Sequence, residues 1–155
     1  MHSVGFIGLG NVGGKLAGSL LRNKCDVMVR DLDRDLAAPF LEDGAKWADS
    51  PKVMAEACEI IITCLPSPAA SATVMEADDG VLAGLSAGKI WAEMSTTDAV
   101  EVARLGALVE VKGASPIGMA SVLKVMTNYL AMGNLISLSE ALVTSKMAGI
   151  DLNTT

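Results

Sequence analysis

A glycine pattern of the form GxGxxG at residues 8–13 joins a short apolar run to a helix-like segment near the start of the chain. The run at residues 3–9 has the composition of a strand, and residues 11–23 carry large apolar side chains at helical spacing. Residues 26–31 are typical of a second strand, because β-branched valines lie between polar ends. The first thirty residues therefore predict a βαβ unit with a tight glycine turn.

Strand-like and helix-like segments continue to alternate up to residue 108. They are a helix opened by Ser50 and Pro51, strands at 59–65 and 89–94, and a helix from about Asp98 that Ser95, Thr96 or Thr97 can cap. This order predicts an α/β fold, a Rossmann-like parallel sheet with helices on both faces. The alternation stops near Gly113, and residues 119–148 are typical of one long helix that ends at Gly149.

Composition narrows the class of protein. The chain has 155 residues, of which 51% are hydrophobic and 19% charged, so it is long enough for one packed domain and too apolar for a disordered chain. The formal net charge is −6 and no Lys/Arg cluster is present, which argues against nucleic acid and against an anionic membrane surface as partners. The apolar stretch at 125–139 is shorter than the roughly 20 residues that a bilayer crossing needs.

Titratable residues limit the available chemistry. His2 is the only histidine, which leaves little for Ser/His catalysis or for histidine metal sites. The cysteines are odd in number and the chain begins with no signal-peptide pattern, so we expect a reducing, cytoplasmic location. Acidic residues between Asp31 and Glu42 mimic a calcium loop, but Leu36 stands where such a loop needs glycine. We expect a solvated acidic turn and no metal.

The glycine pattern in this βαβ context predicts a dinucleotide site. Gly8 permits the turn, Gly10 lets the backbone approach a pyrophosphate, and Gly13 lets the helix pack on the strand, while the helix N-terminus attracts phosphate. A glycine turn that serves packing alone is the alternative. The predicted cofactor-binding residues are Gly8, Leu9, Gly10, Asn11, Val12, Gly13 and Asp31.

Asp31 bears on the choice of cofactor. It lies 18 positions beyond Gly13 at the end of the second predicted strand, where a carboxylate accepts a hydrogen bond from a ribose hydroxyl. A carboxylate repels a 2′-phosphate, so we expect NAD. Arg30 and Arg34 flank Asp31 and leave NADP open.

Four segments resemble the β-hydroxyacid dehydrogenases, the family that includes 3-hydroxyisobutyrate dehydrogenase. They are GFIGLGNVGGKLAGSLL at 5–21, ITCLP at 62–66, EMSTT at 93–97 and IGMASVLKVMTNYL at 117–130. The resemblance implies that Leu65 and Pro66 line the cofactor cleft and that Ser95 and Thr96 lie near the nicotinamide. It also implies that Lys124 is the catalytic lysine, with Asn128 as its helical partner at the substrate.

The helical spacing of these two residues supports this assignment only in part. Lys124 and Asn128 are four positions apart, so on a helix they share one face, which Ser121 joins. In the functional interpretation, burial lowers the pKa of Lys124, which exchanges a proton with the substrate oxygen during hydride transfer. The residues alone favour a snorkelling lysine beside a hydrogen-bonded core asparagine, and the resemblance reverses that preference.

The chain also departs from the family. A further strand, a substrate-binding DAPVSGG segment and more sheet are expected between the STT segment and the lysine helix, whereas Val111–Gly113 here runs directly into residues 114–118. We therefore expect an incomplete dinucleotide-binding domain at residues 1–113. Residues 114–155 would form a long helix that begins an all-α second domain. Alone, that apolar helix would expose a patch and favour a homo-oligomer.

These observations lead to an expected function and two alternatives. The expected function is an NAD(P)-dependent oxidoreductase that transfers hydride between nicotinamide and a small 3-hydroxy acid or its semialdehyde. The first alternative is a catalytically incompetent dinucleotide-binding fragment that oligomerises through its apolar helix. The second is a helix-mediated interaction protein that does not bind a cofactor, which the intact glycine turn disfavours.

Overall fold

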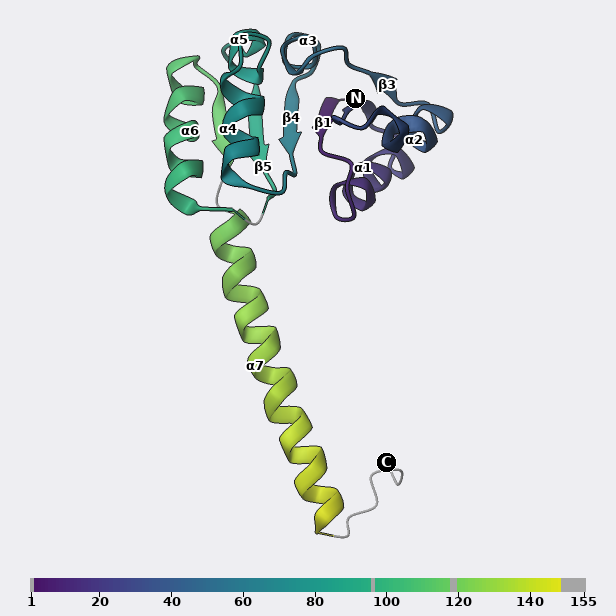
Figure 1. Ribbon diagram of the computed structural model, residues 1–155, viewed down its shortest axis with the longest axis vertical. Helices are drawn as coiled ribbons and strands as arrows, with labels where there is room; N and C mark the ends of the chain where they lie inside the picture. The colour runs from purple at the N-terminus through teal and green to yellow at the C-terminus, as the bar shows by residue number, and fades with distance from the viewer. Residues whose placement is uncertain (1, 96, 118–119, 149–155) are drawn as a thin grey trace. The chain divides into compact units, whose positions relative to one another are not determined.

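The computed structural model describes residues 2–95, 97–117 and 120–148, with the backbone alone for residues 120–128 and 131. Its centre is a six-stranded sheet in the order β3-β2-β1-β4-β5-β6, and every neighbouring pair is parallel. The strands are β1 (Ser3–Ile7), β2 (Asp26–Arg30), β3 (Lys46–Trp47), β4 (Ile60–Thr63), β5 (Ile90–Glu93) and β6 (Ser115–Ile117). The predicted Rossmann-like α/β fold is confirmed, and the strand order reverses direction between β1 and β4 (Figure 1).

Helices connect these strands and cover both faces of the sheet. They are α1 (Gly13–Arg22), the 3-10 helix η1 (Arg34–Ala37), α2 (Ala38–Glu42), α3 (Pro51–Ala57), α4 (Pro68–Glu76), α5 (Val81–Gly84) and α6 (Ala99–Val111). A further helix, α7 (Ala120–Met147), follows β6 in the sequence. Consecutive residues of a strand point to opposite faces. Phe6 accordingly packs with Val27 and Val29 on one face, and Ile7 packs with Ile61 and Trp91 on the other.

Short side-chain caps start three of the α-helices. Ser50 accepts a hydrogen bond from the Val53 amide at 3.1 Å, as the Ser-Pro pattern predicts, and Ser67 does the same for α4. The predicted cap of α6 was wrong. Asp98 caps this helix by accepting from the Val100 amide at 2.9 Å, because it immediately precedes the first helical residue, whereas the Ser95 hydroxyl contacts Glu93.

The sheet continues beyond the point where the sequence pattern ends. The expectation that the alternation stops near Gly113 and that the next strand is missing was wrong, because Ser115–Ile117 pairs with β5 as a sixth parallel strand. Pro116 is tolerated there because an edge strand needs hydrogen bonds on one side only. Backbone contacts divide the chain into residues 1–121 and 122–155, so the sheet domain includes residues that the sequence assigned to the helical segment.

The long helix predicted at 119–148 is observed as α7, 28 residues long. Large apolar side chains are exposed along it, namely Tyr129, Leu130, Met132, Leu135, Ile136, Leu138, Leu142, Val143 and Met147. In the described part of the chain, no helix combines the length and the hydropathy that a membrane span requires.

Candidate functional site

Neighbouring backbone atoms leave no room for a side chain at two of the three glycines in the turn between β1 and α1. Gly8 has φ +97°, and a Cβ there would lie 2.3 Å from the Cys64 carbonyl oxygen at the end of β4. A Cβ at Gly13 would lie 1.9 Å from the carbonyl oxygen of Gly8. Both positions therefore require glycine for reasons internal to the fold, the first because of its φ angle and the close approach of β4, the second because of helix packing.

Gly10 differs from both neighbours. No atom lies within 4 Å of a Cβ built at this residue, which is exposed and has no left-handed φ angle. The following helix has Val12 at its N-cap, no side-chain cap and no acidic residue in its first turn. A helix N-terminus presents unsatisfied N–H donors and a partial positive charge, so this end of α1 suits an anion. A side chain at residue 10 would occupy the space directly beside it.

Asp31 is attached to the same turn, a contact that sequence reasoning missed. Its Oδ2 accepts from the Leu9 amide at 2.6 Å, and its Oδ1 accepts from the Asp33 amide at 3.1 Å. The Gly8 amide donates to the carbonyl of Arg30 at 3.0 Å, so the end of β2 and the turn are joined twice. A carboxylate has about four acceptor positions, which leaves Asp31 able to accept from a ligand hydroxyl as well.

The two arginines that flank Asp31 have different surroundings. Arg30 donates from Nη1 to the carbonyls of Ala48 at 2.9 Å and Asp49 at 2.6 Å, and its guanidinium lies 5.7 Å from the centre of the Trp47 ring. Arg34 stacks on the same ring at 5.2 Å and has no hydrogen-bond partner among the described residues. Arg30 is thus held against the chain after β3, while Arg34 is tethered by the ring contact alone.

The acidic residues after β2 form a turn. Asp33 accepts from the Asp35 amide at 3.0 Å and caps η1, and both side chains are exposed. The carboxylates of Asp31 and Asp33 therefore satisfy backbone amides two residues further along, as Asx-turns do.

Leu65 and Ser95 meet where β4 and β5 end. The Ser95 hydroxyl accepts from the Leu65 amide at 2.7 Å, and Ser95 is only 2% exposed. Pro66 follows on the exposed side of this contact. Of the residues predicted on these two segments, the structure brings Leu65 and Ser95 together, and Thr96 lies outside the described residues. In the described part of the chain, the buried hydroxyl oxygen of Thr97 has no hydrogen-bond partner.

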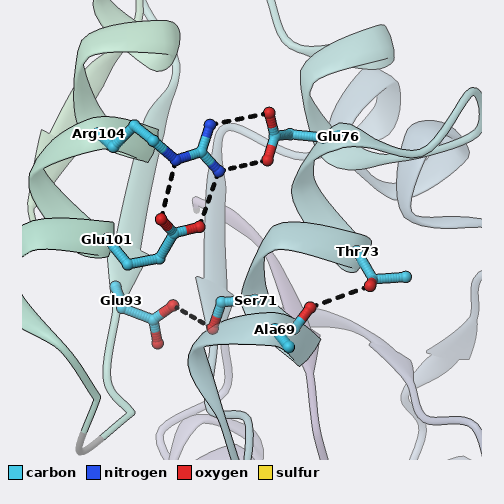
Figure 2. A network of polar contacts seen from close by, with 7 residues as sticks. All are labelled: Ala69, Ser71, Thr73, Glu76, Glu93, Glu101 and Arg104. Atoms are coloured by element: carbon cyan, nitrogen blue, oxygen red, sulfur yellow. Dashed lines mark hydrogen bonds and ion pairs between the residues drawn. The ribbon is translucent and has the colours of Figure 1, made fainter.

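Beneath Ser95 lies a buried carboxylate that the sequence analysis did not identify. Glu93 is 0% exposed and accepts from the hydroxyls of Thr63 and Ser71, each at 3.1 Å, and from the Ser95 amide at 2.8 Å. The Ser95 hydroxyl donates to it as well. Figure 2 shows the contact with Ser71, which comes from α4. The available signal was a glutamate inside an otherwise apolar strand.

An exposed ion cluster links the same helix to α6 (Figure 2). Arg104 donates from Nε to Glu101 at 2.8 Å and from Nη1 to Glu76 at 3.0 Å. These hydrogen bonds from Arg104 lower the pKa of both carboxyls. The cluster therefore fixes α4, and with it Ser71, against α6 on the solvent side.

Lys124 and Asn128 lie on the described backbone of α7, four positions apart and so on one face of the helix. Their side chains are outside the described residues. Their assigned roles therefore stay predictions.

The strand order and the glycine turn at a helix N-terminus define a dinucleotide-binding Rossmann-like domain. Residues 3–121 match the family described as the NAD binding domain of 6-phosphogluconate dehydrogenase, and the chain belongs to this family of NAD-binding domains.

Individual relatives extend the comparison. The chain is 36% identical over 112 residues to mitochondrial 3-hydroxyisobutyrate dehydrogenase of Rattus norvegicus, which covers 68% of this chain and 33% of that protein. It is 31% identical over 96 residues to chloroplastic glyoxylate/succinic semialdehyde reductase 2 of Arabidopsis thaliana, covering 62% and 27%. The chain thus spans about a third or less of these relatives. A Mycobacterium tuberculosis 3-hydroxyisobutyrate dehydrogenase structure shares the fold, with TM-score 0.76, 18% identity, and coverage of 98% of this chain and 67% of that one.

Proposed function

We propose that this domain binds NAD in preference to NADP, and that it serves an oxidoreductase acting on a small 3-hydroxy acid or its semialdehyde. The observation that carries the proposal is the contrast among the three glycines. The fold itself requires Gly8 and Gly13, whereas nothing in the described chain requires Gly10, so a ligand beside the N-terminus of α1 is the reason for glycine there.

Three groups of residues around the turn would each contact a different part of the cofactor. Gly10, Asn11 and Val12 would hold the pyrophosphate through backbone amides, with Leu9 beside them. Asp31, at the end of β2, would hold the adenosine ribose. Because the strand order reverses at β1, the nicotinamide half would extend to the ends of β4 and β5, where Leu65, Pro66, Ser95 and Thr96 lie in sequence.

The preference for NAD rests on local charge. The Asp31 carboxylate repels a 2′-phosphate, and Arg30 is already engaged by two carbonyl groups beside Trp47. Of the two arginines, Arg34 alone remains able to reach a 2′-phosphate. Because one mobile cation has to offset the Asp31 charge, we expect NADP to bind more weakly than NAD.

The relatives and the spacing of residues on α7 support the proposed chemistry. When bound, NAD(P) supplies the acceptor or donor of the hydride. Lys124 would exchange a proton with the substrate oxygen, and Asn128, one turn further, would orient the substrate. Ser95 would help to bind the substrate, and its hydroxyl also accepts the hydrogen bond from the Leu65 amide. The rat and Arabidopsis relatives are named for reactions of small carboxylic acids, which supports a small hydroxy acid here.

A second candidate function is a catalytically incompetent dinucleotide-binding fragment that oligomerises through α7. The large apolar side chains exposed along this helix favour it, because a patch of that kind is rare on a monomer. In either case we propose a homo-oligomer in the cytoplasm, with neither nucleic acid nor membrane as a partner. The net charge of −6 supports the latter point.

The first experiment is calorimetric titration of the intact chain with NAD⁺ and with NADP⁺. Wild-type protein and a Gly133→Val control should bind NAD⁺ more tightly than NADP⁺, whereas Gly10→Val should lose binding of both. The control adds the same side chain at another glycine with open space around it. Equal affinity of Gly10→Val and wild type would contradict the proposed site.

Turnover then separates the two candidate functions. Reduction of NAD⁺ by a panel of small 3-hydroxy acids, abolished in Lys124→Ala, supports the enzyme. Binding of NAD⁺ without any turnover supports the incompetent fragment, and sedimentation of the wild-type chain as a monomer would exclude oligomerisation through α7.

A further inference from the structure

We propose that Glu93 is a positioning residue of the cofactor site and that its buried negative charge makes the site prefer the oxidised, cationic nicotinamide. This inference rests on the proposed function. Its starting point is a carboxylate with no solvent exposure that takes part in none of the salt bridges of the described residues. A buried charge is expensive unless it is fully hydrogen-bonded, so its retention calls for an explanation.

The hydrogen bonds around Glu93 are the set that suits an ionised carboxylate. The Trp91 indole can only donate, and it donates to the Thr63 hydroxyl at 2.9 Å, which leaves the Thr63 hydrogen available for Glu93. Ser71 supplies a second hydroxyl hydrogen, and Ser95 supplies its amide and hydroxyl hydrogens. Four donated hydrogens match the acceptor capacity of a carboxylate, whereas a protonated carboxyl would bring a fifth hydrogen into a ring of donors.

The position of Glu93 connects this charge to the cofactor. It is the last residue of β5, and the hydrogen-bond path runs from Glu93 through the Ser95 hydroxyl to the Leu65 amide after β4. Ligands of open parallel sheets bind outside the carboxyl ends of the strands at the point where the order reverses. The Asp31 side of that point takes the adenosine ribose, so the nicotinamide half falls on the side of Glu93.

Two separable effects follow. Through Ser95, Glu93 sets the position of the Leu65 backbone, which affects both redox forms of the cofactor equally. Its charge acts on one form only, because the oxidised nicotinamide ring is a cation and the reduced ring is neutral. In a site of low dielectric constant a nearby anion stabilises the cation, so Glu93 should raise the affinity for NAD⁺ relative to NADH.

The test compares the dissociation constants of NAD⁺ and NADH for the intact chain and its variants. In Glu93→Gln, the ratio of the NAD⁺ constant to the NADH constant should rise by about fivefold, which corresponds to about 1 kcal/mol. In Ser95→Ala, which keeps the charge and breaks the link to Leu65, both constants should rise by the same factor. Glu110→Gln, a control that neutralises an exposed glutamate on α6 outside this network, should change neither constant.

Each outcome decides the inference. An unchanged NAD⁺/NADH ratio in Glu93→Gln, whatever happens to the separate constants, overturns the proposed charge effect. If Glu93→Gln does not fold, Glu93→Met supplies a neutral side chain of similar length and the same ratio is measured there. If the wild-type chain binds neither NAD⁺ nor NADH, the proposed function itself is overturned. This outcome is distinct from a failure of the inference, because it is seen in the wild-type chain before any variant is measured.

Discussion

Replacing Gly13 by alanine should destabilise the domain, although the same change usually strengthens a helix. A Cβ at this position would lie 1.9 Å from the Gly8 carbonyl oxygen, so the turn and α1 must separate by about 1 Å. That movement also disturbs the Gly8 amide, which is hydrogen-bonded to Arg30. Overpacking of a rigid backbone costs about 1–3 kcal/mol, and the strained hydrogen bond adds about 1 kcal/mol. The helix gains up to about 1 kcal/mol, so we expect a net loss of roughly 1–3 kcal/mol.

Gly18→Ala is the matched control on the same helix. A Cβ there would contact only the mobile end of the Arg22 side chain, at 3.2 Å, and the Phe40 ring at 3.8 Å. This variant should therefore be more stable than wild type by roughly 0.5–1 kcal/mol.

Urea denaturation followed by circular dichroism measures both effects. With a slope of about 1.5 kcal/mol per M, Gly13→Ala should lower the midpoint by roughly 0.7–2 M, and Gly18→Ala should raise it slightly. Midpoints that shift in the same direction for the two variants would refute the argument that Gly13 is fixed by the Gly8 carbonyl.

Two further predictions concern titratable groups. Burial raises the pKa of the Cys58 thiol, an effect that Lys89 partly opposes, so at pH 8 iodoacetamide should label Cys58 more slowly than Cys25. Peptide mass spectrometry measures the two rates, and equal labelling of the native protein would contradict the burial. The raised pKa also means that the Cys58 contribution to stability is complete below the unfolded pKa of about 8.5 and is lost as the pH rises above it. In the exposed cluster on α4 and α6, Arg104→Gln should raise the pKa of Glu76 and Glu101, measured by NMR titration of their carboxyl carbons. Because these pKa values are lowered in the folded state, the stability difference between wild type and Arg104→Gln should be present at neutral pH and vanish as the pH falls through them. A difference that persists at pH 2 would point to packing instead.

Strong hydrophobic patterns made most of the sheet predictable, and weak patterns account for what was missed. The strands at β1, β2, β4 and β5 are short apolar runs bounded by turn residues, and the Ser-Pro pair identified α3. The same Ser-Pro signal precedes α4, but its small side chains carry little amphipathic contrast, so this helix went unpredicted. The strand at 115–117 has three residues, one of them a proline, and only pairing with β5 identifies it.

The candidate site was predictable where a motif implies geometry. The glycine spacing indicated the turn and its place before α1, and the distance to Asp31 indicated the end of β2. The network of Glu93 was not predictable, because its members lie on β4, α4 and β5 and meet only through the parallel crossovers. Likewise, the spacing of Asp31 revealed nothing of its hydrogen bond to Leu9.

The central place of β1 in the sheet also shapes how the chain must fold. Of the six strands, β1 is synthesised first. One of its edges can pair early, with β2. The other edge can pair only after β4 has been made, because Val4 pairs with Ile60, 56 positions further along the chain. Closing so long a loop loses entropy before any contact compensates for it, and parallel sheets of this kind fold slowly compared with helical bundles. Until residues 60–63 arrive, an apolar strand with an open edge is available to other chains. The rate of β1–β4 pairing should therefore govern the yield of soluble protein during synthesis, so substitutions that speed this step should improve expression even where they leave the native stability unchanged.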